Sequence, residues 1–223
     1  MSTSILLFAA GLGTRMGDMV KDKPKPLINV AGKTLLDHAL DFTVLNGVGT
    51  RMVNLHYFGD AIREHLAGRD IVISDESDKL LETGGGLKKA LPLLNSNPVL
   101  TMNTDAVWRG PTPLAQIMNA WEDHMEALLL VVPKSRAYGH QGSGDFTIHP
   151  DGQLIRGSET IYTGLQMVRT DTLEAITADK FSMNILWNEI SSRSSLYGTT
   201  YDGHWCDVGQ PSSIPIAENM LNV

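Results

Sequence analysis

The sequence predicts an α/β fold whose mainly parallel, doubly wound sheet is flanked by helices. Short apolar runs at residues 5–8, 51–55 and 127–132 have the length of buried strands. Segments with apolar residues at helical spacing alternate with these runs. The chain has 223 residues, which is ample for one domain with a substantial core. We therefore expect a single domain over residues 1–223.

In the first half of the chain, the expected strands and helices alternate. Leu35 and Leu36 begin the apolar face of a helix, and Gly47 ends it. The expected elements in chain order are a strand at 5–8, a helix at 34–46, a strand at 51–55, a short helix at 61–66, a strand at 71–73, a helix at 87–91 and a strand at 99–103.

The second half begins in the same way and changes texture at Pro133. Residues 138–144 are rich in glycine and are expected to form a ligand loop. Residues 150–152, Pro-Asp-Gly, predict the turn of a hairpin. The expected elements are a helix at 114–121, a strand at 127–132, hairpin strands at 145–148 and 153–156, a strand at 161–168, helices at 173–178 and 184–192, a strand at 196–201 and a closing helix at 214–221.

Charge and cysteine content exclude several classes of protein. The formal net charge is −7, from 18 basic and 25 acidic side chains, so we expect no nucleic-acid partner. The one cysteine, Cys206, excludes an internal disulfide and a cysteine-rich zinc site. The sequence has no apolar run near the ~20 residues of a membrane span and no signal-peptide pattern. We therefore expect a cytoplasmic protein with no membrane partner.

The glycine loop, residues 9–16 with the sequence Ala-Ala-Gly-Leu-Gly-Thr-Arg-Met, follows the first strand and predicts a phosphate site. Gly11 and Gly13 permit a tight turn that brings backbone N–H groups against an anion. Arg15 can donate as a fork to phosphate oxygens, and Lys25, between two prolines, adds a point charge. The spacing fits neither a P-loop nor the dinucleotide-binding G-x-G-x-x-G motif, whose third glycine is methionine here. We interpret the loop as a nucleoside triphosphate cradle.

Asp105 and Asp207 come at the ends of predicted strands, where doubly wound sheets place their ligands. Two carboxylates far apart in the sequence can converge on Mg²⁺, a hard cation that prefers carboxylate and phosphate oxygens. Position alone leaves open a second interpretation, in which either aspartate is a turn or helix-capping residue.

Three further groups of residues bear on the chemistry of the chain. The glycines at 84–86 come at a predicted helix start and are expected to present a second surface of free N–H groups. The seven histidines show no zinc-binding spacing. Gln141 interrupts a G-x-S-x-G nucleophile elbow around Ser143, so hydrolase chemistry has little support.

Together these motifs resemble the signature of the sugar-1-phosphate nucleotidyltransferases, and the resemblance covers nearly the whole chain. The motifs follow in family order: Gly-Leu-Gly-Thr-Arg-Met at 11–16 with Pro-Lys-Pro-Leu at 24–27, Glu-Thr-Gly-Gly-Gly at 82–86 with residues 90–94, residues 103–108, and residues 203–209. The resemblance implies a Rossmann-like, GT-A-like nucleotide-diphospho-sugar transferase fold. It also implies Mg²⁺-dependent transfer of a nucleotidyl group from an NTP to a sugar 1-phosphate, with release of pyrophosphate.

The resemblance assigns roles to the residues that match its motifs. It implies that Arg15 and Lys25 contact the phosphates and that Asp105 and Asp207 hold the metal, so these four are the expected catalytic residues. The expected nucleotide-binding residues lie at about 1–110 and are Ala10, Gly11, Gly13, Thr14, Glu82, Gly84, Gly85 and Asn103. The expected sugar-phosphate-binding residues lie at about 111–223 and are Gly144, Asp145, Glu159, Thr163 and Gly164.

The compact length and these motifs are most similar to the N-acetylmuramate-1-phosphate uridylyltransferases of bacterial cell-wall recycling, which predicts UTP and N-acetylmuramic acid 1-phosphate as substrates. Mannose-1-phosphate guanylyltransferase and glucose-1-phosphate nucleotidyltransferase activities stay open as alternatives, because the Glu-Lys-Pro sugar motif of longer relatives is missing and residues 157–160 stand in its place. A regulatory subunit that binds a nucleotide sugar without turnover is a further alternative, although all four expected catalytic residues are present. We expect a monomer or a small homo-oligomer.

Overall fold

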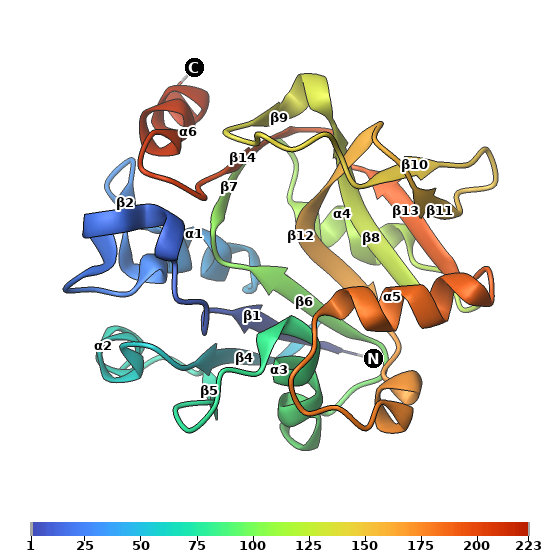
Figure 1. The fold of residues 1–223 in the computed structure, drawn as a ribbon, viewed down its shortest axis with the longest axis horizontal. Coiled ribbons are helices and arrows are strands. Elements are labelled where there is room, and N and C mark those ends of the chain that lie inside the picture. The colour runs from blue at the N-terminus through green and yellow to red at the C-terminus, as the bar shows by residue number, and fades with distance from the viewer. Residues whose placement is uncertain (1, 223) are drawn as a thin grey trace.

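The protein, described over residues 2–222 by a computed structural model, is built on a nine-stranded sheet (Figure 1). The strands of this sheet are β1 (Thr3–Phe8), β4 (Val48–Leu55), β5 (Val72–Asp75), β6 (Val99–Asn103), β8 (Ala127–Pro133), β10 (Phe146–Ile148), β11 (Leu154–Arg156), β12 (Thr160–Val168) and β13 (Leu196–Thr200). Their order along one path is β11-β10-β12-β6-β1-β4-β5, while β8 joins β12 to β13.

Four of the eight strand pairs of the central sheet run parallel and four run antiparallel. β1 pairs in parallel with both β4 and β6, β4 pairs in parallel with β5, and β13 pairs in parallel with β8. The antiparallel pairs involve β12, which lies between β6 and β8, and β10, which pairs with β12 and β11. The predicted mixed sheet is therefore confirmed, with most of its parallel pairs around β1 and its antiparallel pairs around β12 and β10.

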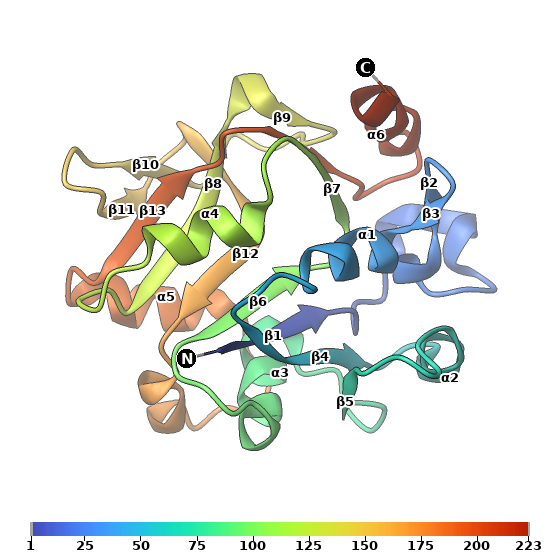
Figure 2. The same ribbon diagram turned by 180° about the vertical axis from the view of Figure 1, so that it is seen from behind.

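Helices cover both faces of this sheet, as Figures 1 and 2 show from opposite sides. α3 (Glu82–Ala90) and α5 (Met183–Ser192) lie in front in Figure 1, and α1 (Leu35–Phe42) and α4 (Pro113–Ala120) lie in front in Figure 2. Two further helices, α2 (Gly59–His65) and α6 (Ser213–Asn222), lie at one side.

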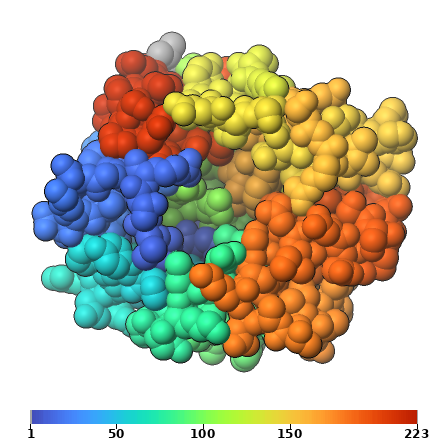
Figure 3. All heavy atoms as spheres, viewed as in Figure 1, coloured from blue at the N-terminus to red at the C-terminus, as the bar shows by residue number. Residues whose placement is uncertain are grey.

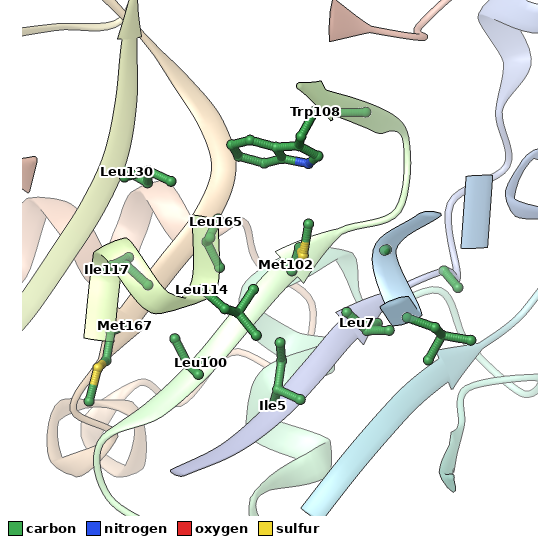
Figure 4. Packing of buried hydrophobic residues seen from close by; sticks show 14 of the residues in the cluster. Ile5, Leu7, Leu100, Met102, Trp108, Leu114, Ile117, Leu130, Leu165 and Met167 are labelled. Carbon is green, nitrogen blue, oxygen red and sulfur yellow. The ribbon is translucent and has the colours of Figure 1, made fainter. Parts of the chain in front are cut away.

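The alternation of side chains along β1 divides the core into two layers. Ile5 and Leu7 point to the face of α1 and α4, where they pack with Leu100, Met102 and Leu114 (Figure 4). The intervening Leu6 belongs to the opposite layer, which includes side chains of α3 and α5. All three β1 side chains are fully buried. A strand buried on both faces reads as a continuous apolar run, as residues 5–8 do.

A smaller three-stranded sheet carries the chain back to the end of β6. It consists of β7 (Ala106–Arg109), β14 (His204–Asp207) and β9 (Ala137–Tyr138). β14 runs antiparallel to β7, with Asp207 opposite Ala106, so residues 105 and 207 become neighbours. α6 packs on this sheet through a third apolar cluster that includes Val107, Cys206 and Ala217.

The remaining described elements are short. β2 (Asn29–Val30) and β3 (Lys33–Thr34) form a small hairpin. The 3-10 helices are η1 (Thr14–Val20), η2 (Lys25–Leu27), η3 (Leu91–Leu93), η4 (Lys134–Arg136) and η5 (Asp171–Ala175). None of the helices within residues 2–222 has the length and apolar character that a membrane crossing requires.

The structure differs from the expected element bounds in a few places. The helix expected over 34–46 ends at Phe42, because the Thr43 hydroxyl donates to the Leu40 carbonyl and closes the last turn. The helix expected at 173–178 is the short 3-10 helix η5. The helix expected at 87–91 begins earlier, at Glu82, so the three glycines lie inside α3.

Those glycines let other parts of the chain pack closely on α3. A Cβ atom on Gly85 would lie 2.1 Å from the Asp179 carbonyl oxygen, and one on Gly84 would lie 2.5 Å from the Phe181 ring. A Cβ atom on Gly86 would lie 2.7 Å from the Glu76 carboxylate. Residues 179–181 and Glu76 therefore approach the helix backbone at a distance that only glycine permits.

We predict that Gly85→Ala destabilises the protein by about 1–3 kcal/mol, because the clash with backbone outweighs the gain of about 1 kcal/mol in helix propensity. Urea unfolding followed by circular dichroism measures this difference. The matched control is Gly59→Ala at the start of α2, where a Cβ atom meets Leu55 at an ordinary 3.6 Å. The control should be neutral or slightly stabilising. Equal stability of the two variants would contradict the proposed close approach.

Candidate functional site

A cavity of about 440 Å³ opens beyond the carboxyl ends of β1 and β6, where parallel sheets hold their ligands. Figure 3 shows this face hollowed near its centre, with the N-terminal part of the chain on one side and the segment that contains α5 on the other. Many of the residues expected from the sequence line it: Ala10, Gly11, Gly13, Thr14, Arg15, Lys25, Glu82, Asn103 and Asp105.

Lys25 is a buried cation at one end of this cavity. It begins η2 directly after Pro24, and its Nζ lies 2.8 Å from Asp105 Oδ2. Gly13 packs against its stem: a Cβ atom there would lie 2.8 Å from Lys25 Cβ, and the Gly13 φ is +64°. The second glycine of the loop is therefore needed both for the turn and for the position of the lysine.

Asp105 and Asp207 are brought side by side by the smaller sheet. The Val208 N–H donates to the Asp105 carbonyl at 2.8 Å, one residue beyond the end of β14. Gly209 then lies between two charged groups, since a Cβ atom on it would be 3.0 Å from both Arg15 Nη1 and Asp207 Oδ2. Arg15 and Lys25 thus flank a pair of carboxylates that are about 100 residues apart in the sequence.

The electrostatics of Asp207 reflect this crowding. Burial, and next the Asp105 carboxylate, raise the pKa of the Asp207 carboxyl above its usual value, while Lys25, Arg15 and His140 offset part of the rise. Ionised Asp207 is therefore incompletely compensated by the protein's own charges. Such a pair of oxygen donors favours an added cation.

The donor set fits Mg²⁺. Carboxylates are ligands that a hard divalent cation prefers, and Mg²⁺ is typically held by one or two of them, with waters and substrate phosphates completing its octahedron. Within residues 2–222 there is no group of three or more His, Cys, Asp or Glu side chains that could form a fuller cage. Asp105 and Asp207 would therefore hold the ion only together with phosphate oxygens and water.

A buried polar pair beside the glycine loop was missed by the sequence reasoning. Asn54, at the end of β4, accepts hydrogen bonds from the Ala9 N–H at 2.7 Å and the Ala10 N–H at 3.3 Å. Its amide donates to Glu76 Oε1 at 2.7 Å, and burial raises the pKa of the Glu76 carboxyl. Both residues line the cavity and follow or end a parallel strand, the same signal that identified Asp105.

The expected second surface of free N–H groups at residues 84–86 is wrong for Gly84 and Gly85. Both N–H groups donate to the Phe181 carbonyl, at 2.9 and 3.0 Å, because residues 179–181 cover this side of α3. Of the neighbouring motif, Glu82 and Thr83 line the cavity. Glu82 is exposed at its edge with a left-handed φ of +62°.

A second cavity, of about 260 Å³, adjoins the first and shares Phe8, Thr83, Asn103 and Ser182 with it. Asp145, expected to bind the sugar phosphate, lines this cavity. Its Oδ2 accepts a hydrogen bond from the Tyr162 N–H at 2.9 Å, so the hairpin β10–β11 is tied to β12 at this point. The shared residues make the two cavities neighbouring compartments of one site.

The other expected sugar-phosphate residues lie elsewhere. The expected contact of Thr163 with the sugar phosphate is corrected by the structure, because its side chain is buried and its hydroxyl donates to the Leu130 carbonyl at 2.6 Å. Gly164 is buried behind Asn103, where a Cβ atom would lie 2.8 Å from Asn103 Cβ. Gly144 and the exposed Glu159 are outside the lining of both cavities in the described chain.

Comparison with known proteins agrees with this architecture. Residues 5–186 match the MobA-like NTP transferase domain. The chain belongs to this family. It is 36% identical over 236 residues to the N-acetylmuramate alpha-1-phosphate uridylyltransferase of Caulobacter vibrioides, an alignment that covers 97% of the chain and 96% of the relative. The protein of the same name from Neisseria meningitidis is 30% identical over 216 residues, with 92% of each chain covered.

The fold has close counterparts among solved structures. The inositol-1-phosphate CTP transferase from T. maritima superposes with a TM-score of 0.77, covering 99% of this chain and 95% of that one at 14% identity. The predicted GT-A-like fold is confirmed by this likeness, and the family places the chain among the sugar-1-phosphate nucleotidyltransferases. In this nucleotidyltransferase Arg15, Lys25 and Asp105 line the larger cavity, and Asp207 lies beside them without lining it.

Asp207→Asn should raise the urea midpoint of the ligand-free protein at about pH 8. The folded state raises the pKa of this acid above its usual value of 3.8, so ionising it costs folding free energy once the pH exceeds that value. The cost grows as the pH rises through the folded-state pKa. The advantage of the variant should therefore shrink as the pH is lowered toward about 4.

The matched control is Asp202→Asn, which removes an exposed carboxylate from the neighbouring turn. It should leave the midpoint nearly unchanged. A midpoint for Asp207→Asn below that of the wild type at about pH 8 would mean that the Asp207 carboxylate stabilises the fold, contrary to its electrostatic surroundings.

Proposed function

We propose that this chain transfers the uridylyl group of UTP to N-acetylmuramate 1-phosphate, releasing pyrophosphate, in the recycling of cell-wall sugars. The observation that carries the proposal is the cluster of Arg15, Lys25 and Asp105 in the lining of one cavity, with Asp207 next to them and a second cavity beside the first. The reaction class follows from the family, and the choice of substrates is supported by the names of two relatives that are 36% and 30% identical.

In this reaction an oxygen of the sugar 1-phosphate attacks the α-phosphorus of UTP in line. A new bond forms between that oxygen and the α-phosphorus, and the bond from the α-phosphorus to the bridging oxygen of pyrophosphate breaks. The nucleophile is already anionic at neutral pH, so its attack needs no general base. The obstacle is the repulsion between two polyanions, and positive charge has to be supplied where they meet.

The cationic side chains are placed to supply that charge. Arg15 can donate to phosphate oxygens with two N–H groups. The buried Lys25 ammonium can stabilise the negative charge that develops on the leaving pyrophosphate. Mg²⁺, held by Asp105 and Asp207, would supply further neutralisation of phosphate oxygens. Holding both substrates in orientation contributes as much as roughly 7–11 kcal/mol of the barrier reduction.

The two cavities suggest how the substrates divide the site. The triphosphate would follow the glycine loop toward Lys25, and the uracil and ribose would extend toward Glu82 and the Asn54–Glu76 pair, all of which line the first cavity. The sugar would occupy the second cavity beside Asn103 and Asp145. On this proposal, residues at about 1–110 supply most of the nucleotide contacts and residues at about 111–223 most of the sugar contacts.

A substrate panel tests the proposal. Pyrophosphate release is measured for UTP with N-acetylmuramate 1-phosphate, GTP with mannose 1-phosphate, and UTP or dTTP with glucose 1-phosphate. We expect the first pair to have the highest kcat/KM. A higher kcat/KM for another pair would contradict the substrate assignment, and the absence of turnover with every pair would favour a regulatory subunit.

We predict that Asp105→Asn lowers kcat for pyrophosphate release by about 100-fold or more while the protein stays folded, because a metal ligand and the partner of Lys25 are both lost. Circular dichroism and the urea midpoint verify folding. Turnover within a few-fold of the wild type would contradict the proposed role of Asp105 in the reaction.

Lys25→Ala should reduce kcat by about 100-fold and change KM for UTP much less, since its charge matters most when negative charge develops in the transition state. Lys23→Ala is the matched control, because it removes an exposed lysine two residues earlier. Steady-state kinetics with UTP varied separate the two constants. A change confined to KM would assign Lys25 to ground-state binding only.

A further inference from the structure

Arg156, the last residue of β11, is the one basic residue among those that line the second cavity in the described chain. Its Nη2 donates to Asn184 Oδ1 at 2.7 Å and to Asn188 Oδ1 at 3.1 Å, and both asparagines belong to α5. The guanidinium carbon lies 4.8 Å from the centre of the Phe146 ring and 5.8 Å from that of Trp187. The side chain is thus held by neutral groups on two sides.

These neutral partners leave Arg156, which is exposed to solvent, without an acidic partner. Among the ion pairs within residues 2–222, none includes Arg156. Asp145 lines the same cavity, but its Oδ2 accepts from the Tyr162 N–H. The hydrogen bonds formed by the guanidinium use one nitrogen, Nη2, in this part of the chain. The guanidinium therefore keeps free N–H donors whose arrangement suits a carboxylate.

The aromatic residues beneath Arg156 are buried, and one of them is hydrogen-bonded. Trp187 Nε1 donates to Gln166 Oε1 at 2.7 Å, and Gln166 Nε2 donates to Thr101 Oγ1 at 3.0 Å. The Tyr162 ring meets the Trp187 ring edge to face at 4.9 Å between centroids. The exposed side chain of Arg156 therefore lies on a buried, hydrogen-bonded platform, which restricts its positions before a ligand arrives and lowers the entropy cost of binding.

The position of Arg156 separates it from the reacting phosphates. Lys25 and Asp105 line the first cavity and are outside the lining of the second, whereas Asn103 belongs to both. In Figure 1, β10, β11 and α5 lie on one side of the molecule, and α1 and α6 lie on the other. A sugar whose 1-phosphate reaches Asp105 past Asn103 would therefore present a ring substituent to Arg156.

We infer that Arg156 binds a carboxylate carried by the sugar ring and so selects acidic sugar 1-phosphates. This inference rests on the proposed function, under which the sugar is N-acetylmuramate, whose 3-O-lactyl group ends in a carboxylate. The guanidinium would donate two N–H groups to the lactyl carboxylate while Asn184 and Asn188 hold its other edge. Neutral sugar 1-phosphates would leave the charge of Arg156 unpaired in the cavity.

The test compares two substrates that differ only in the lactyl group. N-acetylglucosamine 1-phosphate has the same ring and phosphate as N-acetylmuramate 1-phosphate and lacks the acidic ether. In Arg156→Gln, kcat/KM for N-acetylmuramate 1-phosphate should fall about 10–100-fold, and that for N-acetylglucosamine 1-phosphate should change less than about threefold. Arg156→Lys keeps the charge but loses the paired N–H donors of the guanidinium. Its kcat/KM for N-acetylmuramate 1-phosphate should lie between those of the wild type and Arg156→Gln.

Arg63→Gln on α2 is the matched control, because it removes one exposed arginine from a helix that contributes nothing to the lining of the second cavity in the described chain. It should leave both substrates unaffected. A fall that is equal for both substrates in Arg156→Gln would assign Arg156 to a group they share or to the fold, and would overturn the inference. An unchanged preference for N-acetylmuramate 1-phosphate would overturn it as well.

The failure of the proposed function has a different signature. A wild-type enzyme that prefers a neutral sugar 1-phosphate to N-acetylmuramate 1-phosphate overturns the substrate assignment and, with it, the role of Arg156. A wild-type preference for N-acetylmuramate 1-phosphate that persists in Arg156→Gln overturns only the role of Arg156. The same wild-type measurement therefore separates the two.

Discussion

The rest of the structure depends on one constraint, which is that charged side chains must be held close together where β6, η2 and β14 meet. Asp105 and Asp207 lie next to each other in a partly buried place, and their mutual repulsion adds to the cost of burying Asp207. The ammonium of Lys25, 2.8 Å from Asp105, offsets part of that cost. Each neighbouring element contributes to this arrangement. β6 ends just before Asp105, and the pairing of β14 with β7 brings Asp207 next to it. The start of η2, between two prolines, buries Lys25.

The same constraint connects stability to function. A pair of carboxylates that the protein neutralises incompletely lowers the stability of the ligand-free state and favours a cation and phosphates when they arrive. The glycines act in the same direction. Gly13 lets Lys25 approach the loop, and Gly84 to Gly86 let residues 179–181 and Glu76 pack closely against α3. In the proposed substrate arrangement, the α-phosphorus of one substrate and the phosphate of the other would meet beside Asn103, which lines both cavities.

Most of the fold and the charged end of the site could be predicted from the sequence, because both depend on local signals. Apolar runs such as residues 5–8 identified the strands, and glycines and strand-end aspartates identified the glycine loop and the carboxylate pair. Side-chain direction and long-range packing could not be predicted in this way. Thr163 lies in the expected strand but its side chain points into the core, and the Gly84 N–H donates to a carbonyl nearly 100 residues later. Asn54, Glu76 and Arg156 lie in no glycine motif, and their roles depend on neighbours that only the fold brings close.

The measurement that bears most directly on the carboxylate pair is a titration of Mn²⁺, a carboxylate-binding substitute for Mg²⁺, followed by electron paramagnetic resonance in the presence of UTP. If Asp105 and Asp207 hold the ion together with the triphosphate, the wild type should bind Mn²⁺ more tightly with UTP than without it. With UTP present, the double variant Asp105→Asn/Asp207→Asn should bind Mn²⁺ at least about tenfold more weakly than the wild type. Equal Mn²⁺ affinity in the wild type and the folded double variant, each with UTP bound, would contradict the assignment of this charge cluster as the centre of the reaction.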